Sequence, residues 1–101
     1  MSEASVTFGI PGELKLVGVL DYRSGARLRE EGGALIRGSE APSLMLDCSA
    51  VEHSSSVGLA LLLAYMRDAS AAGKAVSVRG LPEEMREIAQ VYGVTELLDG
   101  H

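Results

Sequence analysis

Hydrophobic residues occupy every second position in two N-terminal segments, and their spacing then becomes helical. Residues 5–10 alternate in this way, which predicts a short strand. Pro11-Gly12 predicts a turn, so residues 14–20 are expected to form a second strand in a hairpin with the first. Between residues 22 and 37, apolar side chains stand among charges at helical spacing. We predict a helix there, irregular near Gly32, because each glycine weakens a helix by about 1 kcal/mol relative to alanine.

The most apolar stretch of the chain follows a group of three serines, Ser54, Ser55 and Ser56. Serine is favoured at helix N-caps because its side-chain oxygen can accept a hydrogen bond from a backbone N–H that the helix leaves unpaired. We therefore predict a helix that starts at Ser55 or Ser56 and runs to about Ala72. Its first turns are apolar nearly all round, and such a helix is buried on more than one side.

Strands and helices alternate in the second half of the chain. Residues 43–48 contain an apolar run between turn residues, which predicts a central strand covered on both faces, with a loop over residues 49–55 after it. Residues 75–79 predict another strand, and Gly80-Leu81-Pro82 opens a third helix with proline in its first turn. Residues 94–98 predict a final short strand or extended segment. The expected inner face of the third helix consists of Met85, Ile88, Ala89 and Tyr92.

This order of elements predicts a small α/β fold. After the opening hairpin, the alternation of strands and helices implies parallel pairing through crossover connections. A chain of 101 residues is long enough for one domain with one core. We therefore expect residues 1–101 to form a single domain, a mixed sheet of about four or five strands with about three main helices packed on it.

Composition and charge narrow the classes of partner. The net charge of -5 argues against a basic face for nucleic acid and against a polybasic membrane patch. Cys48 is the one cysteine, so no internal disulfide can form, which fits a reducing cytoplasm. The N-terminal residues lack the basic and apolar regions of a secretory signal. The uncharged run at 57–66 is shorter than the roughly 20 residues that span a bilayer, so no direct membrane insertion is expected.

Candidate chemistry centres on the serines. A serine nucleophile needs a base and an orienting group, and His53 and Asp47 are near Ser56 in the sequence, but no Gly-x-Ser-x-Gly elbow is present. The histidines and the cysteine lack metal-ligand spacing. We therefore predict no catalytic residue, no metal and no cofactor. Two interpretations remain for Ser54–Ser56: a structural cap, which the residues alone favour, or a phosphorylated or partner-contacting Ser56 at a helix N-terminus, where the dipole favours negative charge.

Several motifs resemble the STAS domain family, which includes the anti-sigma factor antagonists. The similarity runs from Leu46 to Leu98 through Leu-Asp-Cys-Ser-Ala-Val, Ser-Ser-Val-Gly-Leu-Ala-Leu-Leu-Leu, Gly-Leu-Pro and Ala-Gln-Val-Tyr-Gly-Val-Thr-Glu-Leu-Leu. Gly18–Asp21 at the end of the opening hairpin resembles the family's Gly-x-Leu-Asp. The resemblance covers nearly the whole chain and implies a single STAS domain.

The resemblance gives Ser56 a candidate role. In the antagonist branch, the hydroxyl residue that follows the aspartate of an Asp-Ser/Thr-x-Gly-Leu signature is phosphorylated by an anti-sigma kinase. Aligned on Gly58, that position is Ser56, so one implied function is an anti-sigma factor antagonist switched by phosphorylation on Ser56. The sequence departs from the signature at Ser55, which takes the place of the aspartate, and at Val57, which is bulkier than the usual residue.

The run Gly-Leu-Ala-Leu-Leu-Leu, the short chain and the Ala-x-x-Tyr helix are most similar to the branch typified by MlaB. That branch contains non-catalytic cytoplasmic subunits that bind and regulate the ATPase of an ABC transporter, together with its permease. The transporter moves phospholipids between the inner and outer membranes and supports outer-membrane lipid asymmetry. The resemblance implies an MlaF-like ATPase as partner and a location peripheral to the inner membrane. The implied contact residues are His53, Ser54, Ser55, Ser56, Gly58 and Tyr92.

Overall fold

A computed structural model describes residues 4–10 and 12–94 of the chain. Its four strands form one sheet in the order β1-β2-β3-β4. The strands are β1 (Ser5–Phe8), β2 (Glu13–Leu20), β3 (Ser43–Ser54) and β4 (Ala75–Arg79). β1 and β2 pair antiparallel, whereas β3 pairs parallel with both β2 and β4. The predicted mixed sheet, with its opening hairpin followed by parallel strands, is therefore confirmed, while most of the extended segment predicted at 94–98 lies outside the described residues.

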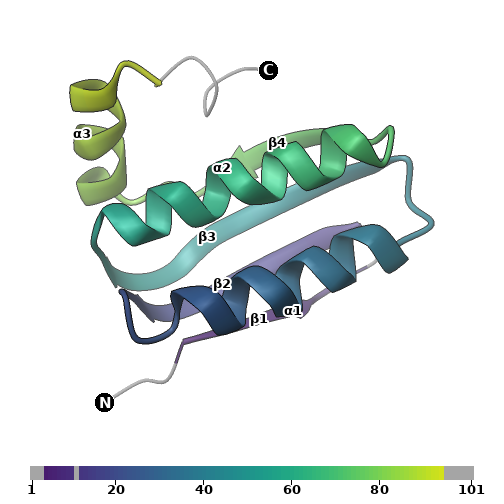
Figure 1. Cartoon of the computed structure of the whole chain (residues 1–101), viewed down its shortest axis with the longest axis horizontal. Coiled ribbons are helices and arrows are strands. Elements are labelled where there is room, and N and C mark those ends of the chain that lie inside the picture. Colours follow the sequence, from purple (N-terminus) through teal and green to yellow (C-terminus); the bar gives the residue numbers. More distant parts are fainter. Residues whose placement is uncertain (1–3, 11, 95–101) are drawn as a thin grey trace.

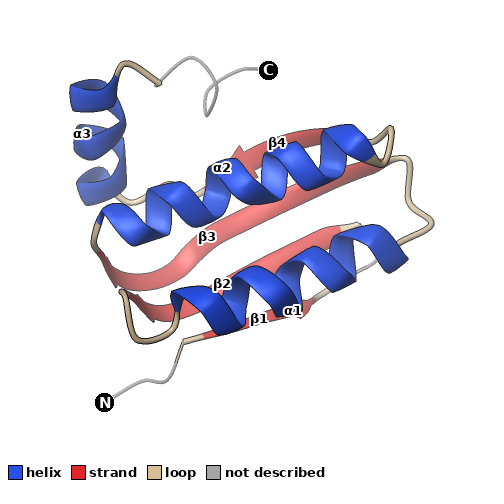
Figure 2. Cartoon of the chain, in the orientation of Figure 1, coloured by secondary structure: helices blue, strands red, loops and turns tan. Residues whose placement is uncertain are grey.

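Three helices complete the described part of the chain: α1 (Gly25–Gly38), α2 (Ser56–Ala71) and α3 (Glu83–Tyr92). α1 and α2 lie side by side on one face of the sheet and run along the strands (Figure 1). α3 is set across the start of α2 and packs against α2 and β3 (Figure 2). None of these helices has the length and apolar character that a membrane span requires. The α/β class with three helices agrees with the sequence prediction.

The core fills the space between the sheet and the helices. The alternation of β2 turns every second side chain toward the helices, and α1, α2 and α3 each contribute an apolar stripe. Burying each large aliphatic side chain contributes about 1.5–3 kcal/mol. The largest fully buried side chains are Tyr65, Leu14, Leu16, Leu20, Leu28, Ile36, Leu46, Leu62 and Met85.

α1 differs from the prediction at its start and in its middle. It begins at Gly25 rather than Tyr22, because the Asp21 side chain accepts a hydrogen bond from the backbone of Arg23 (2.9 Å) and holds a turn before the helix. The predicted irregularity near Gly32 is wrong. Gly32 is buried in a continuous helix, and the ring of Tyr65 from α2 occupies the space that a side chain at this position would need. This glycine allows α1 and α2 to approach closely.

β3 is twice as long as predicted and includes most of the segment expected to be a loop. Along its pairing with β2, β3 gains one extra residue between Asp47 and Ala50 and another between Val51 and His53. Each gain is a β-bulge, in which two residues on one strand face one on its neighbour. The bulges break the alternation of apolar and polar residues. The strand therefore resembles a loop in the sequence, although its pairing continues to Ser54.

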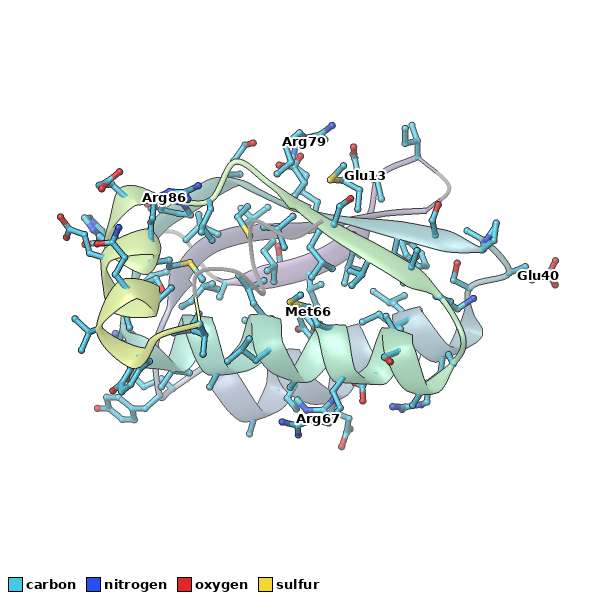
Figure 3. All side chains as sticks on the ribbon, turned by 90° about the horizontal axis from the view of Figure 1, so that it is seen from above. Glu13, Glu40, Met66, Arg67, Arg79 and Arg86 are labelled. Atoms are coloured by element: carbon cyan, nitrogen blue, oxygen red, sulfur yellow. The ribbon has the colours of Figure 1, made fainter. Side chains whose placement is uncertain are left out.

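β3 is central, but the prediction that it is covered on both faces is wrong within the described residues. Figure 3 shows Glu13 and Arg79 on the face of the sheet that points away from α1 and α2. On this face Arg79 donates hydrogen bonds to Asp47 (3.0 Å) and to Glu13. Lys15 is exposed on the same face. The apolar run in β3 is therefore explained by one buried face and a partly buried polar cluster on the other.

α3 begins and ends close to the predicted residues. Pro82 is its N-cap rather than a residue of its first turn, and Gly93 ends it with a left-handed φ of 72°. Met85 and Ala89 are fully buried, as predicted for the inner face, and Ile88 is half-buried. Tyr92 is 62% exposed, so its predicted place on the inner face is wrong. The buried stripe ends at Ala89, one turn before the helix does.

Candidate functional site

Ser55 joins the start of α2 to the end of β2. Its hydroxyl accepts a hydrogen bond from the backbone N–H of Val57 (3.1 Å), which makes it the N-cap, as predicted. Its own N–H donates to the carbonyl of Leu20 (3.0 Å), and its hydroxyl also donates to that carbonyl (3.5 Å). A serine N-cap typically contributes about 1 kcal/mol to stability. Ser55 therefore has a structural role.

Gly58 and Ser54 fit against each other beneath the start of α2. The Ser54 hydroxyl donates to the carbonyl of Ser55 (2.8 Å) and occupies the space that a Cβ on Gly58 would need. The same Cβ would lie 3.2 Å from the Cβ of Ser54 and 3.3 Å from that of Leu20. Position 58 therefore requires glycine because the packing around it leaves no space for a side chain.

Ser56 differs from the two serines before it. It is the first residue of α2 and is exposed. Its hydroxyl makes no hydrogen bond to any residue between 4 and 10 or between 12 and 94. The positive end of the α2 dipole lies at this position. Of the three serines, Ser56 is therefore the one whose hydroxyl is available to an incoming group.

α3 reaches residues 53–56, which we name the serine segment, through Glu84, an acidic residue in the first turn of the helix. The backbone N–H of Ser54 donates to Oε1 of Glu84 (2.9 Å), and Nδ1 of His53 lies 3.8 Å from Oε2. The side chain of His53 is 75% exposed. The contact joins residues 30 positions apart, so it depends on how α3 packs and no local pattern in the sequence indicates it.

An apolar groove, which no local pattern in the sequence predicts, lies between the first turns of α1 and α2. Its volume is about 380 Å³, and Gly25 opens it because a Cβ there would lie 2.8 Å from Cγ1 of Val57. Ser56 and Ala60 are four residues apart, so they share one face of α2, and Ser56 directly precedes Val57, which lines the groove. The groove is lined by Tyr22, Gly25, Ala26, Arg29, Val57, Ala60 and Leu61.

The groove is lined by one aromatic side chain, Tyr22, and one charged side chain, Arg29. Tyr22 is 82% exposed, an unusual state for a large aromatic residue. Arg29 forms an ion pair with Asp68 of α2 (2.5 Å) and links the two helices. Small residues on both helices explain the hollow, because they leave space where larger side chains would pack. We name the groove, together with the exposed Ser56 that precedes Val57, the Ser56 surface.

Tyr92 lies apart from the other residues of the predicted site. It is eight residues after Glu84 on α3, and at 1.5 Å per residue this separation is about 12 Å along the helix axis. Glu84 contacts the serine segment, so Tyr92 is at the far end of the helix from that contact. The structure thus brings together His53, Ser54, Ser55, Ser56 and Gly58, but not Tyr92.

The groups considered for nucleophilic catalysis have other partners. Asp47 accepts hydrogen bonds from Arg79 (3.0 Å) and from the backbone of Ser49 (3.0 Å). The hydrogen bond from Arg79 is the main cause that lowers the pKa of Asp47 to about 2. His53 faces Glu84, so an Asp47–His53–Ser56 triad is not assembled. Among the described residues, no group of three or more His, Cys, Asp or Glu side chains could hold a metal ion.

Similar structures share this architecture. A chain in the Acinetobacter MlaFEDB complex, in an ATP-bound conformation, superposes with a TM-score of 0.77 at 25% identity over 92% of this chain and 97% of that chain. The unphosphorylated anti-sigma factor antagonist SpoIIAA gives 0.73 at 16% identity over 98% and 89%. An anti-sigma factor antagonist from Mycobacterium paratuberculosis gives 0.69 at 24% identity over 95% and 81%. The likeness to the two antagonists supports the fold alone.

The sequence itself matches a family. Curated proteins give no significant match to the chain. The family model described as "Mlab, STAS domain" matches residues 7–99, which is nearly the whole chain. The strand, bulge and capped helix around Ser55 lie within that match, and so does α3. The chain therefore belongs to the STAS domain family, in the group that this model describes.

Proposed function

We propose that this STAS domain is a non-catalytic subunit that binds and regulates the ATPase of an ABC transporter, which moves phospholipids between the inner and outer membranes. The observation that carries the proposal is the Ser56 surface, where an exposed hydroxyl without a described partner directly precedes Val57, a residue that lines an apolar groove. The likeness to a chain of the MlaFEDB complex supports an ATPase of that type as the partner. Binding to such a complex would place the protein in the cytoplasm at the inner membrane.

The subunit would act through binding alone. A bound partner shifts a conformational equilibrium only by its difference in affinity for the two states. The domain would therefore stabilise one conformation of the ATPase, and through it support transport and lipid asymmetry. Members of this family are generally regulatory or accessory subunits, which supports a role without chemistry of its own.

The variant Ser56→Asp tests this proposal. A carboxylate in place of the hydroxyl would have to leave water when the partner closes over the groove, and an unpaired buried charge is costly. We expect the affinity for the ATPase to fall by at least about tenfold, which corresponds to about 1.4 kcal/mol. The free domain should remain stable, because an acidic residue at the start of a helix interacts favourably with the dipole.

Ser56→Ala is the matched control for that variant. It removes the hydroxyl without adding charge, so the expected loss of affinity is the small value of one exposed hydrogen bond. Calorimetric titration of the purified ATPase with the parent and both variants measures these differences. Equal affinity of Ser56→Asp and the parent would show that Ser56 is not at the interface.

A phosphorylation switch is the second candidate function. The same exposed hydroxyl of Ser56 favours it, and a phosphoryl group would add about -1.5 to -2 charges at pH 7 at the start of α2. The residue at position 55 argues against it, because Ser55 takes the place of the usual aspartate and its hydroxyl is used as the N-cap. Incubation with an anti-sigma kinase and ATP, followed by intact mass, tests this function, and an unchanged mass would exclude it for that kinase.

A further inference from the structure

α3 contacts the serine segment through the side chain of Glu84. Its carboxylate accepts the backbone N–H of Ser54 (2.9 Å), and its other oxygen lies 3.8 Å from Nδ1 of His53. A hydrogen bond to a charged acceptor is stronger than one between neutral groups. The approach to His53 joins two side chains that are at least half exposed, and such pairs contribute little. The hydrogen bond to Ser54 is therefore the contact through which Glu84 holds the serine segment.

Glu84 lies on a helix that is packed into the core, whereas most of the segment that it contacts is exposed. Met85, the next residue, is fully buried, and so is Ala89 one turn later. These two residues anchor α3 in the core, so the position of the Glu84 backbone is fixed by packing. His53, Ser55 and Ser56 are all exposed. Glu84 therefore adds a restraint from α3 to a segment that β2 and the cap of α2 also hold.

The hydrogen bond connects to Ser56 through a short series of contacts. It fixes the backbone of Ser54, whose side chain lies against Gly58 at the base of α2. The next residue, Ser55, caps the helix and is bonded to Leu20 of β2. Three elements thus determine where the serine segment lies, and Glu84 supplies the contribution of α3.

We propose that Glu84 is a positioning residue of the partner-binding surface, which holds residues 53–56 so that the Ser56 hydroxyl is presented to the partner. The proposal rests on the proposed function, since it assigns Glu84 a role in docking to the ATPase. Without the carboxylate, the Ser54 N–H bonds to water and residues 53–56 sample more conformations. Docking then has to order the segment, and affinity falls because ordering a loop costs free energy.

Three variants of the full chain test the role. Glu84→Ala removes the acceptor, Glu84→Gln keeps a side-chain oxygen that can accept the same hydrogen bond, and Glu83→Ala removes the neighbouring exposed acid as the matched control. Two measurements are made on each: amide hydrogen exchange of Ser54 in the free chain, and affinity for the purified ATPase. For Glu84→Ala we expect exchange at Ser54 about tenfold faster and affinity about three- to tenfold weaker. Glu84→Gln should restore most of both, and Glu83→Ala should match the parent.

The outcomes separate this proposal from the proposed function. If Glu84→Ala binds as tightly as the parent while Ser56→Asp binds weakly, Glu84 does not position the surface, and the proposed function stands. If Glu84→Gln binds as weakly as Glu84→Ala, the charge matters rather than the hydrogen bond, which also overturns the positioning role. If the parent itself does not bind the ATPase, the proposed function is wrong, and the docking role of Glu84 falls with it.

Discussion

Replacing Gly58 by alanine tests the packing beneath the serine segment. The added methyl group would overlap the Ser54 hydroxyl and lie 3.2 Å from the Cβ of Ser54 and 3.3 Å from that of Leu20. The hydroxyl can rotate away if it gives up its hydrogen bond to the carbonyl of Ser55 (2.8 Å). Leu20 is fully buried and has little room to move. The substitution therefore has an identifiable cost at each of these contacts.

The magnitude follows from three contributions. Overpacking a filled site costs about 1–3 kcal/mol, and the lost hydrogen bond about 0.5–1.5 kcal/mol. Alanine in place of glycine within a helix returns about 1 kcal/mol. We therefore expect Gly58→Ala to lower the free energy of unfolding by about 1–3 kcal/mol. In a Ser54→Ala background the hydroxyl is absent, so the same substitution should cost at least about 1 kcal/mol less.

Urea unfolding of the parent, both single variants and the double variant measures this coupling. The cycle isolates the interaction between positions 54 and 58, provided that the slope of unfolding against urea is the same in all four proteins. If Gly58→Ala costs the same in both backgrounds, the Ser54 hydroxyl is not what excludes a side chain at position 58, and our explanation of this glycine is wrong.

Two further substitutions test the fold around the site. Gly32→Ala should lower the free energy of unfolding by at least about 2 kcal/mol, because its methyl group would overlap the buried ring of Tyr65. Gly38→Ala is the control, because a methyl group there would have nothing within 4 Å, and it should be neutral or stabilising. Equal effects of the two substitutions in thermal unfolding would contradict this explanation. The pKa of Asp47 is lowered to about 2, so its ion pair with Arg79 stabilises the fold fully above about pH 4, and this contribution is lost as the pH falls from 4 toward 2. Arg79→Met should remove about 1–2 kcal/mol of that pH-dependent stability, after allowance for the exposed Arg79, and an unchanged acid dependence would refute the assignment.

Local signals in the sequence were enough to predict most elements and the start of α2. Ser55 caps the helix because its hydroxyl accepts a neighbouring N–H, and such a contact is encoded within a few residues. The end of α3 at Gly93 is encoded in the same way, through a left-handed φ that glycine adopts readily. The fold class followed from the order of strands and helices, and the resemblance to STAS domains agreed with it.

The features that the sequence did not reveal depend on contacts between distant segments. Gly32 resembles a helix breaker until Tyr65 is placed against it, and β3 resembles a loop until its bulges are paired with β2. Glu84 reaches Ser54 only because α3 packs across the start of α2. Tyr92 has the spacing of a core residue, but the core does not extend to the last turn of α3. Each of these features requires tertiary packing that no local pattern specifies.

The most direct test of the central claim is to identify the native partner and the mass of the chain in one purification. Tagged protein would be isolated from its own cells in mild detergent, its partners identified, and the intact chain weighed. Our account predicts an ABC ATPase and a membrane permease at a fixed ratio, with no phosphate added to the chain. A kinase partner in their place, or a phosphorylated fraction that disappears in Ser56→Ala, would contradict it and establish the phosphorylation switch instead.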